Sequence, residues 1–402
     1  MGRTVAPRRL RILFLAPQPF FEVRGTPLAV LHMTRALAGL GHQVDLLTFP
    51  QGGSAPTEGV RHLRSLRLAV GRVKAGASLA KMVLDVPFIV EAAWRLRFGH
   101  YDVVHAVEEA AHLIAPFARW FGVPLVMDVD SSIPDQLRYS GFATRGPLLR
   151  LAERLERHAL RHAAAAITVC ASLTEGVKTR APGLPVFQVE DPPLVEPGVA
   201  PPPEVVEALR RDLTLGPWPV VLYSGNFEPY QGVELLLDAL ALVPHVQLLL
   251  MGGGPDDVAR MKAEARGRGV GERCVFSGQR PPSDLPAFLA LADVLASPRA
   301  KGQNTPFKIF TYLASGKSLV ATRIPTHTQL LDDATAFLVE PTPQGLASGI
   351  QAALDRPEDA AARARAGREL IEREYSVERY REKIARAYAA VERLAAREQP
   401  RS

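Results

Sequence analysis

The sequence contains little cysteine. Cys170 and Cys274 are its only cysteines in 402 residues, and they lie far apart without a C-x-x-C or metal-ligand spacing. A disulfide framework and a zinc site therefore have no support, and we expect no metal. Two reduced thiols favour a cytoplasmic setting.

Long apolar runs are also lacking. The first 17 residues combine basic side chains with only about six apolar positions, too few for a secretory signal or a membrane span. No aromatic-rich basic motif of a nucleic-acid domain occurs, so we expect no nucleic-acid partner. The formal charge of +6 and the pI near 9.4 remain compatible with phosphorylated substrates or anionic lipid.

The N-terminal half predicts a doubly wound α/β domain. Residues 10–17 form a short continuous apolar run, as in a strand that is buried on both faces. Residues 25–40 have helical spacing and end before Gly41, a plausible C-cap, and residues 44–48 read as the next strand. Further strands are expected at 102–105 and 124–130, on either side of a helix at 110–121.

The C-terminal half repeats this alternation after a proline-rich connection that begins at residue 191. A helix is predicted at 233–242. In the charged tail from 376 to 398, Tyr380, Ile384, Tyr388, Val391 and Leu394 line one helical face. Strands are predicted at 220–224, 246–251, 274–277, 294–296 and 319–322.

Ligands of open α/β sheets bind at the carboxyl ends of the strands, so the loops at these positions are the informative ones. The first loop, residues 17–28, lacks the G-x-G-x-x-G of dinucleotide binders, which argues against a nicotinamide cofactor. Gly25 and Thr26 stand where a helix begins, and their N–H groups could hold a phosphate. A glycine turn with a threonine N-cap explains them equally well.

Residues 297–331 carry the strongest anion-binding signal. Three cations follow a buried strand and precede a helix start, together with amide and hydroxyl donors. A solvated basic loop would explain the charges but not their clustering with such donors. The cations are Arg299, Lys301 and Lys308, and the neutral donors come from Gly302, Gln303, Asn304 and Thr305.

The stretch LASGKSLVAT at 313–322 resembles the end of the donor segment of family 4 retaining glycosyltransferases. Other family features follow in order, among them LGHQVDLLT at 40–48, DVVHA at 102–106 and YSGNFEPYQGVELLLDAL at 223–240. The resemblance covers nearly the whole chain. It implies the GT-B fold: two Rossmann-like domains facing a cleft, with a C-terminal helix that crosses back to the N-terminal domain.

The donor segment departs from the family pattern. The two glutamates of E-x7-E fall on Gln303 and Thr311, and the usual Arg and Lys of the loop after the first strand of the second domain fall on Asn226 and Gln231, near Gly225. Thr311 could keep at most one hydrogen bond to a ribose. We expect Arg299, Lys301 and Lys308 to supply the displaced charge.

Polar residues also follow two strands of the first half. Family members carry a His facing the sugar where this chain has Asp130, so Asp130 is a candidate for binding a sugar or acceptor hydroxyl. His105 and Glu108 could join it, although a structural role for His105 is as compatible with the sequence. Asp128 and Asp130 mimic a Mn²⁺-binding D-x-D, which we reject because the order of motifs is that of GT-B.

Other candidates carry weaker signals. Gly254 ends a glycine run after a strand, and Gln279 with Arg280 lies where the family grips the nucleotide base largely through backbone atoms. Residues 61–81 contain six Lys or Arg and no acid, with Leu63, Leu66, Val70 and Val73 at helical spacing. That pattern predicts either a basic amphipathic surface on an anionic membrane or a solvated helix face.

We therefore expect an acceptor domain at 1–195, a nucleotide-sugar domain at 196–375 and a returning helix at 376–402. The resemblance implies a retaining transferase of polysaccharide biosynthesis. It would move a sugar from a nucleotide diphosphate sugar to a glycan, lipid-linked or small-molecule hydroxyl without a cofactor. It would be cytoplasmic or peripheral on the inner face of the membrane. A nucleotide-sugar epimerase of the same fold and a non-catalytic scaffold protein remain alternatives.

Overall fold

The computed structural model describes residues 9–21, 25–53, 57–68, 79–139 and 144–398. The chain divides into two compact units. The N-terminal unit comprises Met1–Glu190 together with Tyr380–Ser402, and the C-terminal unit comprises Asp191–Arg379. These boundaries lie a few residues from those expected at 195 and 375.

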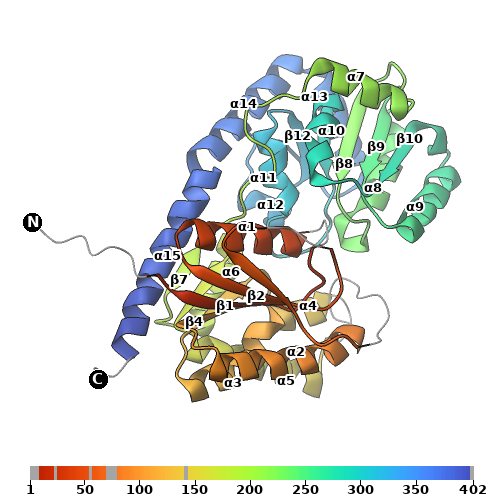
Figure 1. Ribbon diagram of the computed structural model, residues 1–402. Helices are drawn as coiled ribbons and strands as arrows, with labels where there is room; N and C mark the ends of the chain where they lie inside the picture. Colours follow the sequence, from red (N-terminus) through yellow and green to blue (C-terminus); the bar gives the residue numbers. More distant parts are fainter. Residues whose placement is uncertain (1–8, 22–24, 54–56, 69–78, 140–143, 399–402) are drawn as a thin grey trace, which may run out of the picture. The chain divides into compact units, whose positions relative to one another are not determined.

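Among the described residues, the N-terminal unit has a sheet of seven parallel strands in the order β3-β2-β1-β4-β5-β6-β7 (Figure 1). Its strands are β1 (Arg11–Ala16), β2 (Gln43–Thr48), β3 (Val60–Arg64), β4 (Val103–Val107), β5 (Leu125–Val129), β6 (Ala165–Thr168) and β7 (Val186–Gln188). Its helices are α1 (Gly25–Gly39), α2 (Leu79–Phe98), α3 (Glu109–Phe121), α4 (Ile133–Tyr139), α5 (Pro147–His162), α6 (Ala171–Arg180) and most of α15 (Val377–Glu398).

Helices cover both faces of this sheet. One core cluster joins α2, α3, α5 and α6 to the sheet, and a second joins α1 and α15 to the other face. From α15, Tyr380, Ile384, Tyr388 and Val391 are buried in the second cluster as their spacing predicts, whereas Leu394 is half-buried. The C-terminal helix thus completes the core of the N-terminal unit.

The C-terminal unit repeats the plan with six parallel strands among its described residues, in the order β10-β9-β8-β11-β12-β13. Its strands are β8 (Val220–Ser224), β9 (Gln247–Met251), β10 (Cys274–Gly278), β11 (Val294–Ser297), β12 (Ser318–Thr322) and β13 (Phe337–Val339). Its helices are α7 (Pro203–Asp212), α8 (Val233–Leu242), α9 (Pro255–Gly267), α10 (Leu285–Leu291), α11 (Phe307–Ala314), α12 (Pro325–Thr328), α13 (Pro343–Asp355) and α14 (Pro357–Glu374), with short 3₁₀ turns at Pro229–Gln231, Gly271–Arg273 and Pro282–Asp284.

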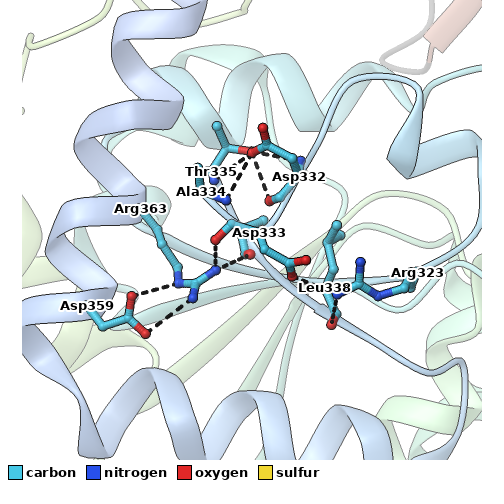
Figure 2. Close-up of polar contacts among 9 residues, drawn as sticks. Arg323, Asp332, Asp333, Ala334, Thr335, Leu338, Asp359 and Arg363 are labelled. Carbon is cyan, nitrogen blue, oxygen red and sulfur yellow. Dashed lines mark hydrogen bonds and ion pairs between the residues drawn. The ribbon is translucent and has the colours of Figure 1, made fainter.

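An arginine of α14 fastens the segment between α12 and β13. Arg363 binds Asp359 on its own helix at 2.9 Å, and it also donates to the carbonyl oxygens of Asp333 and Ala336 (Figure 2). Arg323, directly after β12, pairs with the Asp333 carboxylate at 2.6 Å. The chain that leaves the carboxyl end of β12 is therefore tied to α14.

The expected α/β architecture is confirmed, and the one clear error concerns residues 61–81. Val60–Arg64 is not helical but forms edge strand β3, paired in parallel with β2. A run this short does not distinguish the helical period from the strand period. Pairing with β2 decided that these residues form a strand. Residues 69–78, which include Val70 and Val73, lie outside the described chain, and α2 begins only at Leu79.

Candidate functional site

In the C-terminal unit, the strand order reverses between β8 and β11, whose connections run to opposite sides of the sheet. Open α/β sheets bind ligands at the carboxyl edge beside such a switch point. Gly225, Asn226 and Gln231 follow β8, and the segment 298–306 follows β11 and leads into α11. The structure thus brings the two loops with most of the expected donor residues to one edge.

Glycines allow these loops to approach each other closely. A Cβ at Gly225 would lie 2.8 Å from Lys308 Nζ, and one at Gly232 would lie 2.1 Å from the carbonyl oxygen of Pro298. At Gly252, after β9, a Cβ would lie 2.0 Å from the carbonyl oxygen of Gly225. Gly232 and Gly252 also have φ of +71° and +128°, which side chains disfavour. Three neighbouring loops are therefore interlocked through their backbones.

Lys308 points from α11 into this junction. Its Nζ lies 3.4 Å from Gln231 Oε1 and 3.8 Å from the centroid of the Tyr223 ring. Burial first, and then the charge of Arg299, hold the pKa of Lys308 well below its usual range. An anion beside this amine would raise its pKa again, because an opposite charge stabilises the ammonium form.

Arg299 differs from Lys308 because the loop itself already uses its donors. Its guanidinium donates from Nε to the carbonyl oxygen of Lys301 at 2.9 Å and from Nη1 and Nη2 to Asn304 at 3.1 and 3.0 Å. It also lies 5.3 Å from the Tyr230 ring centroid. Arg299 is buried whereas Lys301 is exposed, so the three predicted cations differ in setting.

A buried histidine supports the same edge. His327 of α12 lies 2.9 Å from Ser297 Oγ through Nε2, and its Nδ1 donates to the carbonyl oxygen of Thr322 at 2.7 Å. Burial lowers the pKa of His327 to about 4, so the ring is neutral. The Thr322 hydroxyl donates in turn to the carbonyl oxygen of Arg299 at 2.5 Å. Sequence reasoning missed this residue, although it closely follows the matched turn at 313–322.

The two positions that lack glutamate have structural contacts. Thr311 is buried, and its Oγ1 accepts a hydrogen bond of 3.0 Å from the backbone N–H of Leu194. The carbonyl oxygen of Gln303 accepts from Gln329 Nε2 at 3.0 Å. Thr305 is buried beside this loop. Thr311 therefore holds the proline-rich connection against α11.

The remaining donor candidates lie at the ends of β9 and β10. Gly254 begins α9, where its N–H donates to Asp257 Oδ2 at 3.2 Å. Gln279 is exposed, and the Arg280 guanidinium lies 5.9 Å from the Phe288 ring centroid. Arg280 Nε is buried with no hydrogen-bond partner among the described residues. These residues lie on the same carboxyl edge, farther along the sheet.

In the N-terminal unit, Glu108 ends β4 with a φ of +49°, a strained value for a residue other than glycine. Its carboxylate accepts from Ser131 Oγ at 3.2 Å and lies 3.8 Å from Lys81 Nζ. Lys81 also pairs with Glu109 at 2.5 Å, and burial raises the pKa of Glu109 to about 7. Half-buried Asp130 follows β5 next to Ser131.

His105 and Asp128 lie inside the strands rather than at their ends. His105 is fully buried, with Nδ1 2.8 Å from Tyr388 Oη and Nε2 3.1 Å from Asp128 Oδ2. Asp128 and Asp130 thus have different surroundings. Within the described chain, no group of three or more His, Cys, Asp or Glu residues could hold a metal ion.

Gly25 and Thr26 begin α1, a helix of 15 residues. Gly25 is exposed, and a Cβ added there would meet no atom within 4 Å. The N-terminal N–H groups of α1 have the geometry that binds anions in other helices.

Two parallel α/β units, with polar loops at the carboxyl edge of each sheet, define the class of GT-B proteins. Domain models described as glycosyl transferase 4-like domain and as glycosyl transferases group 1 match residues 24–183 and 218–356. The chain belongs to the group 1 glycosyltransferases of GT-B fold.

Individual relatives agree over almost the full length. The chain is 26% identical to a glycogen synthase of Mycobacterium tuberculosis over 98% of this chain and 97% of the relative. Sucrose-phosphate synthase from Thermosynechococcus elongatus has a TM-score of 0.79 at 22% identity, with 97% of this chain and all of that chain covered. Anabaena HepE in complex with UDP-glucose has a TM-score of 0.76 at 19% identity, covering 95% of this chain and 100% of that one.

None of the helices in the described ranges is both long enough and apolar enough to cross a membrane.

Proposed function

We propose that this glycosyltransferase moves a sugar from a nucleotide diphosphate sugar to an acceptor hydroxyl with retention of anomeric configuration. The carrying observation is Lys308, a desolvated amine at the switch point of the C-terminal sheet, beside the backbone of Gly225. Anabaena HepE, a structural neighbour, was solved with UDP-glucose, which supports a donor of this kind.

The diphosphate would lie where the loops after β8 and β11 meet. Its negative charge would raise the pKa of the Lys308 amine and favour the ammonium form, because an opposite charge stabilises the charged state. Exposed Lys301 would add long-range attraction, and Arg299 would keep the loop in shape through Lys301 and Asn304. Lys308 thus becomes a leaving-group stabiliser whose charge is strongest when donor is bound.

In the reaction, the bond between the anomeric carbon and the diphosphate oxygen breaks, and a bond from the same carbon to the acceptor oxygen forms on the same face. The acceptor proton passes to an oxygen of the departing diphosphate. Charge develops on that diphosphate, which is where a fixed ammonium group lowers the barrier most. No side-chain nucleophile is required by this scheme.

The N-terminal unit would present the acceptor. Asp130, Glu108 and Ser131 place two carboxylates and a hydroxyl at the ends of β4 and β5, and such groups orient sugar hydroxyls by accepting hydrogen bonds. The N–H groups of Gly25 and Thr26 at the start of α1 would bind a phosphate oxygen. We assign His105 no part in acceptor binding, because it is fully buried between Tyr388 and Asp128.

The test begins with ligand-observed NMR on UDP-, GDP-, ADP- and CMP-sugars, followed by turnover with the sugar nucleotide that binds. Lys308→Ala should weaken donor binding and lower turnover by roughly 100-fold. Lys317→Ala is the matched control. Lys317 lies directly before β12 and also has a pKa lowered by burial, but it donates hydrogen bonds to the carbonyl oxygens of Ala290 and Ala292. Normal donor binding and turnover in Lys308→Ala would refute the assignment.

Product analysis tests the type of reaction separately. NMR of the glycoside should show the anomeric configuration of the donor. Inverted product would contradict retention while leaving the donor site intact. If an epimerised sugar nucleotide formed without any acceptor, the enzyme would be an epimerase rather than a transferase.

A further inference from the structure

Helix α2 of the N-terminal unit is apolar on two sides. Leu84, Phe88, Ala92 and Leu96 form one row at a spacing of four residues, and this row is buried in the core against α3 and the sheet. A second row with the same spacing faces outward. Its members are Met82, Val86, Val90, Trp94 and Phe98, which are 54%, 66%, 65%, 61% and 57% exposed. An exposed apolar row on a helix is expected to meet an apolar partner, and among the described residues the core covers only the first row.

The outward row is long and continuous. At a rise of ~1.5 Å per residue it extends for roughly 24 Å along the helix. Single exposed apolar residues are ordinary, but a contiguous apolar strip of this length marks a surface that meets an apolar phase or partner.

Helix α3 continues the apolar surface. Figure 1 shows α2, α3 and α5 in one layer beneath the sheet, and α3 contacts both of the others. At the end of α3, Trp120 is 81% exposed. A shallow hollow of about 540 Å³ lies between the ends of the two helices, lined by Leu96, Arg97, Tyr101, Trp120 and Phe121 among others. Aromatic rings therefore occupy the border of the strip.

Helix α5 adds positive charge to the same layer. Arg150, Arg154, Arg157 and Arg161 are exposed, and within the described chain they form no ion pair. The acidic residues of the three helices are at least partly buried, and most are paired with a cation: Glu91 with Arg95, Glu109 with Lys81, Glu153 with Arg138 and Glu156 with Arg180. The outer face of the layer is therefore apolar, aromatic and cationic.

We propose that the outer faces of α2, α3 and α5 dock on an anionic lipid bilayer. Val and Met side chains would enter the acyl boundary, Trp94 and Trp120 would lie at the headgroup level, and the arginines of α5 would bind lipid phosphates. This combination of chemistry fits a lipid surface better than a second copy of the chain, because two such faces would bring their arginine rows together. The exposed apolar row begins at Met82, after residues 61–81, and belongs to the N-terminal unit, whereas the donor site belongs to the C-terminal unit.

Tryptophan fluorescence tests the geometry directly, because two of the three tryptophans lie on this surface and Trp218 lies in the other unit. On vesicles of phosphatidylcholine with phosphatidylglycerol, Trp94 and Trp120 should shift their emission to the blue and be quenched by brominated lipid. The variant Trp94→Phe with Trp120→Phe, which reports Trp218 alone, should show neither change. Quenching of Trp218 instead would overturn the assignment of this face.

Vesicle flotation tests the two kinds of contact separately. Trp94→Ala and Phe98→Ala should each weaken binding by on the order of tenfold, since each removes an aromatic ring from the contact with the bilayer. The control Val205→Ala, an exposed residue of α7, should bind normally.

Removing charge should give a different signature. Arg150→Gln and Arg154→Gln should each weaken binding to anionic vesicles by roughly fivefold and leave weak binding to pure phosphatidylcholine unchanged. The single variants Arg356→Gln and Arg365→Gln, at exposed residues of the C-terminal unit, are the charge-matched controls and should bind normally. No flotation with anionic vesicles would refute the proposal. So would a dimer in sedimentation that dissociates in Trp94→Ala, because the face would then belong to a second copy.

Discussion

The two sheets share one topology, but their carboxyl edges differ in charge. In the C-terminal unit the switch point is occupied by Lys308, with Arg299 and Lys301 on the next loop. In the N-terminal unit, β4 and β5 end instead in carboxylates, those of Glu108 and Asp130. A diphosphate requires fixed cations, whereas sugar hydroxyls are oriented by acceptor oxygens. The contrast gives each unit a separate task.

The edges also differ in how much of the loop backbone is fixed. Gly252 and Gly232 allow loops of the C-terminal unit to touch, and buried His327 joins β11 to β12. At Gly25 of the N-terminal unit, by contrast, nothing lies within 4 Å of the Cβ position. A rigid edge suits the part of the donor common to all nucleotide sugars, and an open helix start leaves room for an acceptor.

The largest effect should come from Gly252→Ala. The new Cβ would meet the carbonyl oxygen of Gly225 at 2.0 Å, where neither backbone segment can yield without disturbing the other. We expect a loss of about 3 kcal/mol or more in unfolding free energy together with loss of donor binding. Gly41→Ala is the control, because Gly41 also has a positive φ, +89°, but no atom within 4 Å.

Urea titrations of both variants, with nucleotide binding measured in parallel, separate steric from conformational strain. Gly41→Ala should lose only about 1 kcal/mol, the cost of the left-handed backbone. Equal losses in the two variants would mean that the loops at the C-terminal edge are not interlocked.

The next effect concerns pH and has opposite signs for two buried groups, His327 of the C-terminal unit and Glu109 of the N-terminal unit. Burial lowers the pKa of His327 from 6.5 to about 4, so the unfolded chain binds a proton in this window and the folded chain does not. The contribution of neutral His327 to the free energy of unfolding is complete above pH 6.5 and is lost as the pH falls toward 4. The loss is about 3 kcal/mol at most. His327→Gln should flatten this acid limb, as followed through Trp218 in the variant Trp94→Phe with Trp120→Phe.

Glu109 provides the contrast in the N-terminal unit. Burial raises its pKa from 4.5 to about 7, so the folded chain keeps a proton that the unfolded chain loses. The contribution of protonated Glu109 to the free energy of unfolding is complete below pH 4.5 and is lost as the pH rises through 7. Glu109→Gln, followed through Trp94 and Trp120, should remove this alkaline loss. An alkaline loss that persisted in Glu109→Gln would contradict this assignment.

The continuous apolar strands and the helix at 233–242 could be predicted from sequence. Strands buried on both faces and a well-bounded amphipathic helix each have a hydrophobic pattern that is visible within a short stretch of sequence. Strand β3 could not, because its five residues fit both the helical and the strand period, and only pairing with β2 decides between them. Lys308 could be selected as a candidate from its residue type and its position at a helix start that follows a buried strand.

The roles of Arg299 and His327 could not be predicted in this way. Arg299 binds carbonyl oxygens two and five residues farther along its own loop, which depends on how that loop folds. His327 connects Ser297 to Thr322, and those residues become neighbours only through the register of β11 with β12. Sequence reports which groups are available, but the fold decides which of them are already engaged.

The smallest effect is expected when one buried hydrogen bond is removed in each unit. These variants distinguish residues that stabilise the fold from residues that bind the donor. Thr311→Val leaves the N–H of Leu194 without its acceptor, and Tyr388→Phe leaves His105 Nδ1 without its hydrogen-bond partner. Each should cost about 1–2 kcal/mol of unfolding free energy. Donor affinity should stay within about twofold of the unmodified protein, because Thr311 is hydrogen-bonded to Leu194 and Tyr388 is buried in the core of the N-terminal unit.

Thr311→Ser is the matched control, because it keeps the hydroxyl and should recover most of the stability lost in Thr311→Val. The decisive measurement is donor binding by titration calorimetry beside urea unfolding. If Thr311→Val lost donor affinity while Thr311→Ser retained it, the hydroxyl would bind the nucleotide after all. Thr311 would then belong with Lys308 to the ligand-binding edge, and the C-terminal unit would hold its donor by a hydroxyl where the family pattern has a carboxylate.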